Sequence, residues 1–288
     1  EMKIDLKAKE VMIAIMDTET AKVITMASSD RYLPKNISRV DYPSLNAGML
    51  EYSFEPGSVI KTIIFALLLD KKLINPYDLV NGHNGRFKIG RKVITDEHEF
   101  DWLSAENVIV HSSNIGIAQL AQKMGGIEYH EGLKEFGFAS KSTPDMIYEK
   151  KGFIPSPTRL NNEIYKATCS YGYGMHANLM QLIRSYSVFN NGGKMVTPKI
   201  VDSFINEIGQ SIKIPKGREP QVIAPATAER VKQILVKTVN KGTGKKTKTP
   251  GLEIGGKTGT AHKVEKGLYV NEYNTAFLGF ANDHKKKY

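Results

Sequence analysis

From residue 55 to residue 69 the chain reads EPGSVIKTIIFALLL. The Pro-Gly pair ends the preceding structure, and the apolar run that follows is long enough to form a buried helix. Ser58 then lies at the N-terminus of this helix, where serine is a favoured capping residue. Lys61 lies one turn further along on the same side, where burial would lower its pKa towards neutrality. A neutral lysine beside a hydroxyl can act as the general base for a nucleophile.

Extended and helical patterns alternate along the rest of the chain. Extended patterns predict a hairpin over 10–26 with a turn at 17–20, a small hairpin over 86–94, two extended segments within 200–214, and strands at 254–261 and 273–280 joined by a turn containing Gly and Lys. Helical patterns predict helices through 108–110, 115–120, 177–189 and 225–239, the first capped by Ser104 with Asn107. Between the first two helices, the polar residues 111–114 predict an exposed turn.

The composition is that of an ordinary globular protein with one domain, because 41% of the 288 residues are hydrophobic and 24% are charged. A formal net charge of +10 permits an acidic partner. Basic residues are scattered, however, and form runs only at 245–248 and 285–287, which we interpret as solvated loops. No aromatic residues interleave with a basic stripe, so nucleic-acid binding is not predicted.

The single cysteine, Cys169, excludes an internal disulfide and a cysteine-rich metal site. No HExxH motif or other paired-histidine motif occurs, so no metal is predicted. No run of 18 apolar residues predicts a membrane span. The chain carries no signal peptide, which fits either a cytoplasmic protein or an excised piece of an exported one.

A phosphate-binding loop is a competing interpretation of residues 251–258. Gly251, four further residues and then Gly256-Lys257-Thr258 match the letters of that motif. The motif requires a buried strand before it and a helix that opens at the threonine. Here Lys-Thr-Pro precedes it, and a glycine with a strand-like segment follows. We therefore do not predict nucleotide binding.

Three separated motifs follow one another along the chain: Ser58-x-x-Lys61, Ser112-x-Asn114 and Lys257-Thr258-Gly259. Together they resemble the signature of penicillin-binding proteins and serine β-lactamases. The likeness covers nearly the whole chain and is greatest to the monofunctional class B members, and within that class to the division-specific transpeptidase. It is carried also by FEPGS at 54–58, SSNIG at 112–116, YGYG at 171–174, NGG at 191–193 and GKTGTA at 256–261.

The resemblance implies a chemical role for each motif residue. Ser58 would attack the carbonyl of the penultimate D-Ala of a peptidoglycan stem peptide, leaving an acyl-enzyme, and Lys61 would take the serine proton. Ser112 would relay a proton to the leaving amine. Asn114 would orient Lys61 and hydrogen-bond the substrate amide. A second amine from a neighbouring strand would then accept the acyl group, and β-lactams would be trapped on Ser58.

The third motif would bind the substrate. Lys257 would supply positive potential, and the hydroxyls of Thr258 and Thr260 would bind the substrate carboxylate. Gly259 would leave room for the substrate to lie along the strand edge as an added strand. Backbone N–H groups of Ser58 and Thr260 would form the oxyanion hole. No metal or other cofactor is implied.

The resemblance also implies an α+β fold of the penicillin-binding and serine β-lactamase type. It has an antiparallel sheet flanked by helices, an all-helical lobe that carries the 112–114 turn, and an active site in the groove between them. Family members continue past 277–280 with a further strand and a C-terminal helix, whereas this chain stops at Tyr288. We therefore expect residues 1–288 to be a transpeptidase domain with an incomplete sheet. The parent protein would add an N-terminal membrane anchor and a pedestal domain, and would act on the periplasmic side of the inner membrane.

The implied partners are peptidoglycan stem peptides on lipid-linked precursor strands, β-lactam antibiotics, and a glycosyltransferase and divisome proteins bound through other parts of the parent protein. An elongation-type transpeptidase is one alternative. A serine β-lactamase or β-lactam sensor is another, with Glu149 or Glu163 as the carboxylate that could activate water. The third is a non-catalytic module that binds cell wall through its basic surface.

Overall fold

The structure is a computed structural model, and it describes residues 2–30, 32–215, 217–265 and 268–288. The helices are α1 (Met2–Asp5), α2 (Gly48–Glu51), α3 (Ile60–Asp70), α4 (Ala105–Val110), α5 (Asn114–Ala121), α6 (Gly126–Glu135), α7 (Pro157–Leu160), α8 (Glu163–Ser170), α9 (Leu179–Asn190) and α10 (Pro225–Lys241). The strands are β1 (Met12–Met16), β2 (Val23–Ser28), β3 (Leu79–Asn81), β4 (Arg86–Ile89), β5 (Lys92–Thr95), β6 (Trp102–Ser104), β7 (Ser203–Ile205), β8 (Ser211–Lys213), β9 (Glu253–Glu265) and β10 (Leu268–Asn282). The fold is thus of the α+β class.

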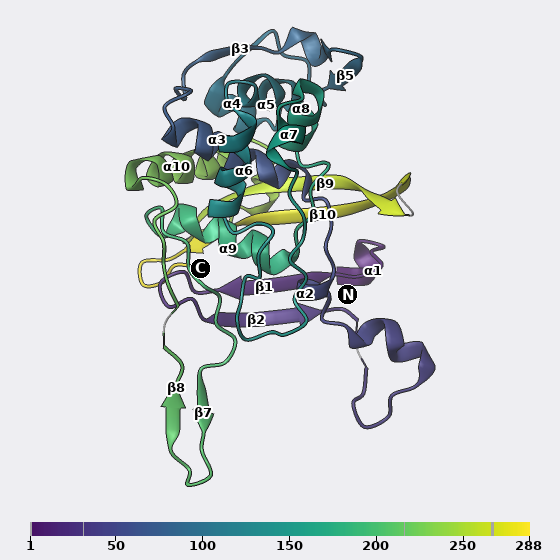
Figure 1. Ribbon diagram of the computed structural model, residues 1–288, viewed down its shortest axis with the longest axis vertical. Helices are drawn as coiled ribbons and strands as arrows, with labels where there is room; N and C mark the ends of the chain where they lie inside the picture. The colour runs from purple at the N-terminus through teal and green to yellow at the C-terminus, as the bar shows by residue number, and fades with distance from the viewer. Residues whose placement is uncertain (1, 31, 216, 266–267) are drawn as a thin grey trace.

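Helix α3 lies at the centre of the helical end of the molecule (Figure 1). Its residues from Ile60 to Leu68 are all buried, because α4, α5, α6, α8 and α10 pack around it. A helix that is apolar on every side requires such surroundings. From α9, the Tyr186 hydroxyl donates a hydrogen bond to the Val59 carbonyl at 2.7 Å. The start of α3 is therefore held from outside the helical end as well as from within it.

Two antiparallel hairpins, β9–β10 and β1–β2, lie below this helical end in Figure 1. Helix α10 packs against β9, and α9 packs against both β10 and β1. The β7–β8 hairpin projects away from the rest of the molecule at the opposite end (Figure 1). The helices thus place one long strand, β9, directly beside the start of α3.

The sheet differs from the single antiparallel sheet that the resemblance implies. Within the described residues, β1–β2 and β9–β10 are separate two-stranded sheets. After β10 the chain turns back on itself, since Ala281 and Tyr288 exchange two backbone hydrogen bonds of 3.0 and 3.2 Å. The Lys287 carbonyl also accepts a hydrogen bond of 3.0 Å from the Thr18 N–H, in the turn of the β1–β2 hairpin, but this segment forms no strand in the described part of the chain. The helical end also differs from the expected all-helical lobe, because it carries the strand pairs β3–β6 and β4–β5.

Most predicted elements are confirmed. The hairpins predicted over 10–26 and 86–94 correspond to β1–β2 and β4–β5, and the extended segments within 200–214 correspond to β7–β8. Ser104 accepts a hydrogen bond from the Asn107 N–H and caps α4, as predicted. The turn predicted between β9 and β10 falls on residues 266–267, which lie outside the described residues. No helix in the described part of the chain is long and apolar enough to cross a membrane.

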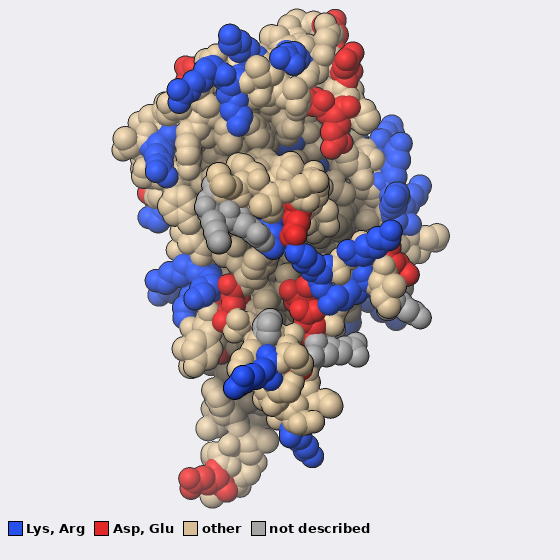
Figure 2. Space-filling model, turned by 90° about the vertical axis from the view of Figure 1, so that its right-hand side faces the viewer, with Lys and Arg blue, Asp and Glu red and all other residues tan. Residues whose placement is uncertain are grey.

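The positive charge is spread over the surface. On the face drawn in Figure 2, Lys and Arg side chains occur in separate groups with acidic side chains between them. Some basic side chains of the protein form ion pairs; Lys237 and Arg230, for example, both contact Glu106. The charge distribution on this face agrees with the interpretation of scattered, solvated basic residues.

Candidate active site

Ser58 lies in a single tight helical turn, Gly57–Val59, that leads into α3. Gly57 has a φ of +61°, and a Cβ there would lie 2.9 Å from the Thr260 carbonyl oxygen. Only glycine allows this backbone and this close approach to β9. The Ser58 side chain does not cap α3, and its hydroxyl makes no hydrogen bond to any described residue. The capping role that its position suggested is therefore not observed.

Lys61 extends from the first turn of α3 and is completely buried. Its Nζ donates to the Asn114 Oδ1 and to the Ser112 carbonyl oxygen, both at 2.6 Å, and to the Ser112 Oγ at 3.2 Å. Two residues that are more than 50 positions apart from Lys61 in sequence thus hold its amine. These contacts bring the first and second motifs together. The spacing of the motifs in the sequence does not by itself show this contact.

The second motif forms the turn between α4 and α5. Ser112 has a φ of +62°, a left-handed conformation that is uncommon for a residue other than glycine. In this conformation the Ser112 carbonyl oxygen accepts a hydrogen bond from the Lys61 amine. The Asn114 Nδ2 donates to the Thr95 carbonyl at 3.0 Å, which fixes the side-chain amide with its oxygen on Lys61. Each polar side chain of this turn therefore has a defined orientation.

Asp96 anchors the same turn, although sequence analysis did not single it out. Its carboxylate accepts hydrogen bonds from the Ser113 hydroxyl at 2.5 Å and from the backbone N–H groups of Asn114 at 2.6 Å and Ile115 at 3.1 Å. These N–H groups belong to the first turn of α5, where backbone N–H groups have no hydrogen-bond partners within the helix. An acidic residue directly after the predicted 86–94 hairpin was the only signal available in the sequence.

The third motif lies on β9, which passes the turn that carries Ser58. A Cβ on Gly259 would lie 2.9 Å from the Val59 Cγ1 and 3.0 Å from the Pro56 carbonyl oxygen. Lys257 is completely buried, and its Nζ donates to the Thr258 carbonyl at 3.1 Å. The Thr258 hydroxyl donates to the Thr243 Oγ1 at 3.0 Å, a contact that sequence analysis missed.

Thr260 is exposed, and its backbone lies against Gly57, next to Ser58. The Ser58 N–H belongs to the first residues of a helical turn, where backbone N–H groups lack partners within the helix. The two residues expected to supply the oxyanion hole are thus neighbours in space. All eight predicted site residues lie on three adjoining segments, namely the start of α3, the α4–α5 turn and β9.

Burial dominates the electrostatics of the two lysines. It lowers the pKa of Lys61 well below its ordinary value, and the charge of Lys257 lowers it further. Asp96 and Glu97 act in the opposite direction on the pKa of Lys61. Burial also lowers the pKa of Lys257, to about 7. A deprotonated Lys61 is therefore accessible at neutral pH, which is what a general base requires.

Comparisons with known proteins agree with this geometry. The family described as penicillin binding protein transpeptidase domain matches residues 11–288. The chain is 28% identical over 277 residues to a Neisseria flavescens protein described as "Probable peptidoglycan D,D-transpeptidase PenA", covering 96% of this chain and 66% of that protein. It is 27% identical to penicillin-binding protein PbpB of Mycobacterium tuberculosis, covering 98% of this chain and 43% of that protein. The chain therefore spans less than two thirds of the length of either relative.

Solved structures give the same result. The transpeptidase domain of Burkholderia pseudomallei penicillin-binding protein 3 superposes with a TM-score of 0.82 at 28% identity, covering 99% of this chain and 79% of that one. Penicillin-binding protein 3 of M. tuberculosis in complex with aztreonam superposes with a TM-score of 0.90 at 25% identity, covering 99% of this chain and 66% of that one. The similarity extends over the described helices and strands as a whole.

Proposed function

Because this chain belongs to the penicillin-binding protein transpeptidase family, of class B, we propose that it is the serine-acylating unit of a peptidoglycan D,D-transpeptidase. One observation carries the proposal: a buried lysine whose pKa is lowered lies one turn after Ser58 and within 2.6 Å of Asn114. Lys61 is held by hydrogen bonds to neutral oxygens only and forms no ion pair with any described residue. Its environment therefore favours the neutral form, which a general base requires.

In the acylation step, the Ser58 Oγ attacks the carbonyl carbon of the penultimate D-Ala, and Lys61 takes the hydroxyl proton. The new C–O bond forms as the carbonyl oxygen becomes an oxyanion between the N–H groups of Ser58 and Thr260. The C–N bond then breaks. The terminal D-Ala leaves after its amine receives a proton through Ser112, which returns Lys61 to its neutral form. An amine of a second stem peptide reverses these steps and forms the cross-link.

Residues of β9 recognise the donor stem peptide. The substrate carboxylate is held by the hydroxyls of Thr258 and Thr260, and Lys257 provides the balancing charge. A pKa of about 7 leaves Lys257 only partly protonated in the free protein at neutral pH. A bound carboxylate favours the charged form and raises this pKa, so binding and protonation of Lys257 occur together.

We infer that residues 1–288 form one transpeptidase domain, in which the separate hairpins β1–β2 and β9–β10 are joined through α9. The packing of α9 against both β1 and β10 supports this inference. So does Ile183 of α9, which packs both against the large buried apolar cluster from Phe54 to Phe280 and against the smaller cluster of Met16, Ala21 and Val196. The parent protein would act in septal cell-wall synthesis at the periplasmic side of the inner membrane, with a glycosyltransferase and divisome proteins as partners.

A β-lactamase is the main alternative, and the position of Glu149 argues against it. Such an enzyme needs a base that activates water to release the acyl group. The Glu149 carboxylate is buried and accepts hydrogen bonds from the Ser142 N–H and hydroxyl, the Thr143 N–H and the Asn178 side chain. It has no free oxygen for a water beside Ser58. We therefore assign Glu149 to the support of this buried network.

The proposal is tested by intact-protein mass spectrometry after incubation with benzylpenicillin, followed over hours. We expect a stable adduct of one penicillin, absent in Ser58→Ala and nearly absent in Lys61→Ala. Cys169→Ser is the control, because this thiol is buried and its pKa is raised to about 12. An adduct on Ser58→Ala, or none on the native chain, would refute the assignment. Rapid return to the unmodified mass with consumed penicillin would identify a lactamase instead.

A further inference from the structure

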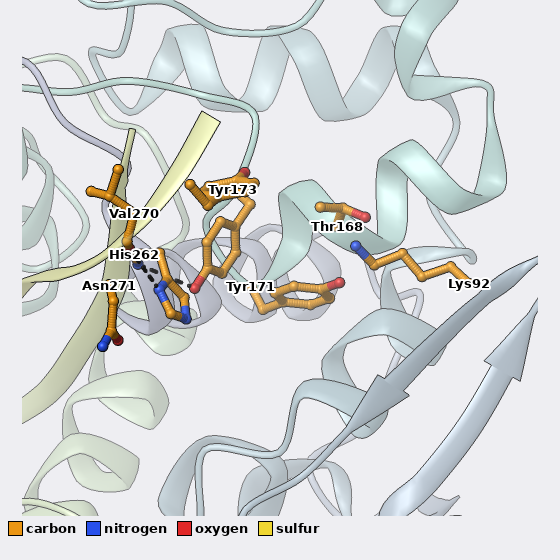
Figure 3. Close-up of a pocket in the computed structure, with 8 residues that line it drawn as sticks. Lys92, Thr168, Tyr171, Tyr173, His262, Val270 and Asn271 are labelled. Atoms are coloured by element: carbon orange, nitrogen blue, oxygen red, sulfur yellow. Dashed lines mark hydrogen bonds between the residues drawn. The ribbon is translucent and has the colours of Figure 1, made fainter. Parts of the chain in front are cut away.

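A pocket of about 490 Å³ opens beside the three motifs and is not used by the acylation step. Its walls are aromatic, formed by Tyr171, Tyr173 and Tyr269, of which the first two are labelled in Figure 3. Its rim is polar and is formed by Lys92, Thr168, His262 and Asn271, together with Val270. The volume falls in the range typical of small-ligand sites, about 300–1,000 Å³. We call it the tyrosine pocket.

Residues of the wall and of the rim of the tyrosine pocket lie on the same elements as the active site, or on a loop that contacts it. Lys92 begins β5, the strand that ends at Thr95 and holds the Asn114 side chain. The loop that carries Tyr171 and Tyr173 contacts the nucleophile turn, because the Gly57 N–H donates to the Gly172 carbonyl at 3.2 Å. His262 lies on β9 two residues after Thr260. A ligand bound along β9 towards its end therefore enters this pocket.

The aromatic walls are held in place by their own contacts. Tyr173 meets Tyr171 and Tyr269 edge-on, with ring centroids 5.9 and 5.6 Å apart. The Tyr269 hydroxyl contacts the Glu55 Oε1 at 3.3 Å, and the Gly174 N–H donates to the same oxygen at 2.6 Å. Glu55 is buried and does not line the pocket. The walls are thus preorganised to receive an apolar or peptide-like body.

The charge that faces the tyrosine pocket is positive. Lys92 is exposed, and Figure 3 shows its amine directed towards Thr168 and Tyr171. It forms no ion pair with any described residue. His262 contributes a second nitrogen-bearing side chain, whose Nδ1 lies 3.2 Å from the Val270 carbonyl. No carboxylate belongs to the described lining residues. A ligand that reaches the rim therefore meets an unpaired ammonium group.

We propose that the tyrosine pocket binds the acyl-side portion of the donor and that Lys92 pairs with a carboxylate carried by that portion. This deepens the proposed function and rests on it, because the donor reaches the pocket only when its reactive carbonyl lies at Ser58. Aromatic walls accept the peptide-like body, and the ammonium group selects an acid over its neutral amide. Lys92 is thus a specificity-determining residue that takes no part in bond breaking.

The test uses succinyl-, glutaryl- and adipoyl-D-alanyl-D-lactate, together with the three corresponding ω-carboxamides. The series varies the distance between the carboxylate and the reactive carbonyl, while the leaving group remains D-lactate. Release of D-lactate therefore measures acylation. We expect the best-matched acid to react about tenfold faster than its amide, as one charge-assisted hydrogen bond predicts. Lys92→Met should abolish this preference, and Lys92→Glu should reverse it.

Lys88→Met is the matched control, because Lys88 is an exposed lysine of the same hairpin that does not line the pocket. It should retain the native preference. Equal rates for acids and amides in the native protein, or a preference that survives Lys92→Met, would overturn the proposal while leaving the proposed function intact. Absence of lactate release from all six donors would also overturn it. The penicillin adduct at Ser58 then decides independently whether the proposed function stands.

Discussion

The anchoring of the α4–α5 turn by Asp96 leads to a quantitative prediction for Asp96→Asn. The native carboxylate accepts three hydrogen bonds, one of them from Ser113, whose side chain is only 1% exposed. A hydrogen bond to a charged group contributes about 1.5–3 kcal/mol, and asparagine keeps one acceptor oxygen. Because Asp96 is itself partly exposed, we expect the free energy of unfolding to fall by about 2 kcal/mol. For a chain of 288 residues, with an unfolding entropy of about 2.1 cal/mol/K per residue, that loss corresponds to a decrease in Tm of about 3 °C.

The same substitution changes the chemistry of Lys61. The charge of Asp96 raises the pKa of Lys61, so its removal lowers that pKa further. The neutral base then persists to lower pH, and the acid limb of the acylation rate with benzylpenicillin moves to lower pH. Thermal unfolding and a pH–rate profile on one protein preparation measure both effects.

Glu97→Gln separates charge from hydrogen bonding. Glu97 also raises the pKa of Lys61, but it makes no hydrogen bond to the described residues of the turn. This variant should move the acid limb in the same direction while leaving Tm within about 1 °C of native, because surface substitutions usually change the free energy of unfolding by no more than about 0.5 kcal/mol. If Asp96→Asn unfolds at the native temperature and keeps the native acid limb, the anchoring role assigned to Asp96 is wrong.

Two further predictions concern stability. Burial lowers the pKa of Lys257 from an ordinary 10.5 to about 7, so between these values the unfolded chain binds one more proton than the folded one. The free energy of unfolding should therefore rise with pH across this window, by up to about 1.4 kcal/mol per unit, and urea denaturation of Lys257→Met should lack that component of the slope. Gly172→Ala would place a Cβ against the Gly57 carbonyl at a φ of +97°, and it should lose about 3 kcal/mol or more of stability and slow acylation. Gly192 has a φ of +58°, and a Cβ there would meet no atom within 4 Å. A loss of more than about 2 kcal/mol of stability in Gly192→Ala would therefore contradict the steric explanation.

Local patterns in the sequence were sufficient for most elements and for the motif residues. The apolar run after Ser58 predicted α3, and the polar residues 111–114 predicted the turn between α4 and α5. Local patterns predicted the hairpins themselves but could not show which strands share a sheet, and within the described residues β1–β2 and β9–β10 form separate two-stranded sheets. Sheet membership is a property of long-range contacts that no local period encodes.

The supporting residues of the site were missed for a related reason. Asp96 and Thr243 act through contacts with residues that are distant in sequence, three hydrogen bonds for Asp96 and one for Thr243. A single aspartate after a hairpin, or a threonine between two glycines, looks like ordinary turn chemistry. Their role follows only from the position of α5 and β9. Glu149 is the reverse case, because a suggestive carboxylate proved to be occupied by its buried neighbours.

One of the two shortest contacts to the Lys61 amine comes from the main chain of Ser112, not from its side chain. Every amino acid supplies that carbonyl, so a substitution at position 112 changes the hydroxyl but retains this acceptor wherever the left-handed backbone is kept. Mutation can therefore alter proton relay at this position without releasing the base. The side chain at position 112 can thus vary during evolution while the main-chain carbonyl that holds the Lys61 amine is retained.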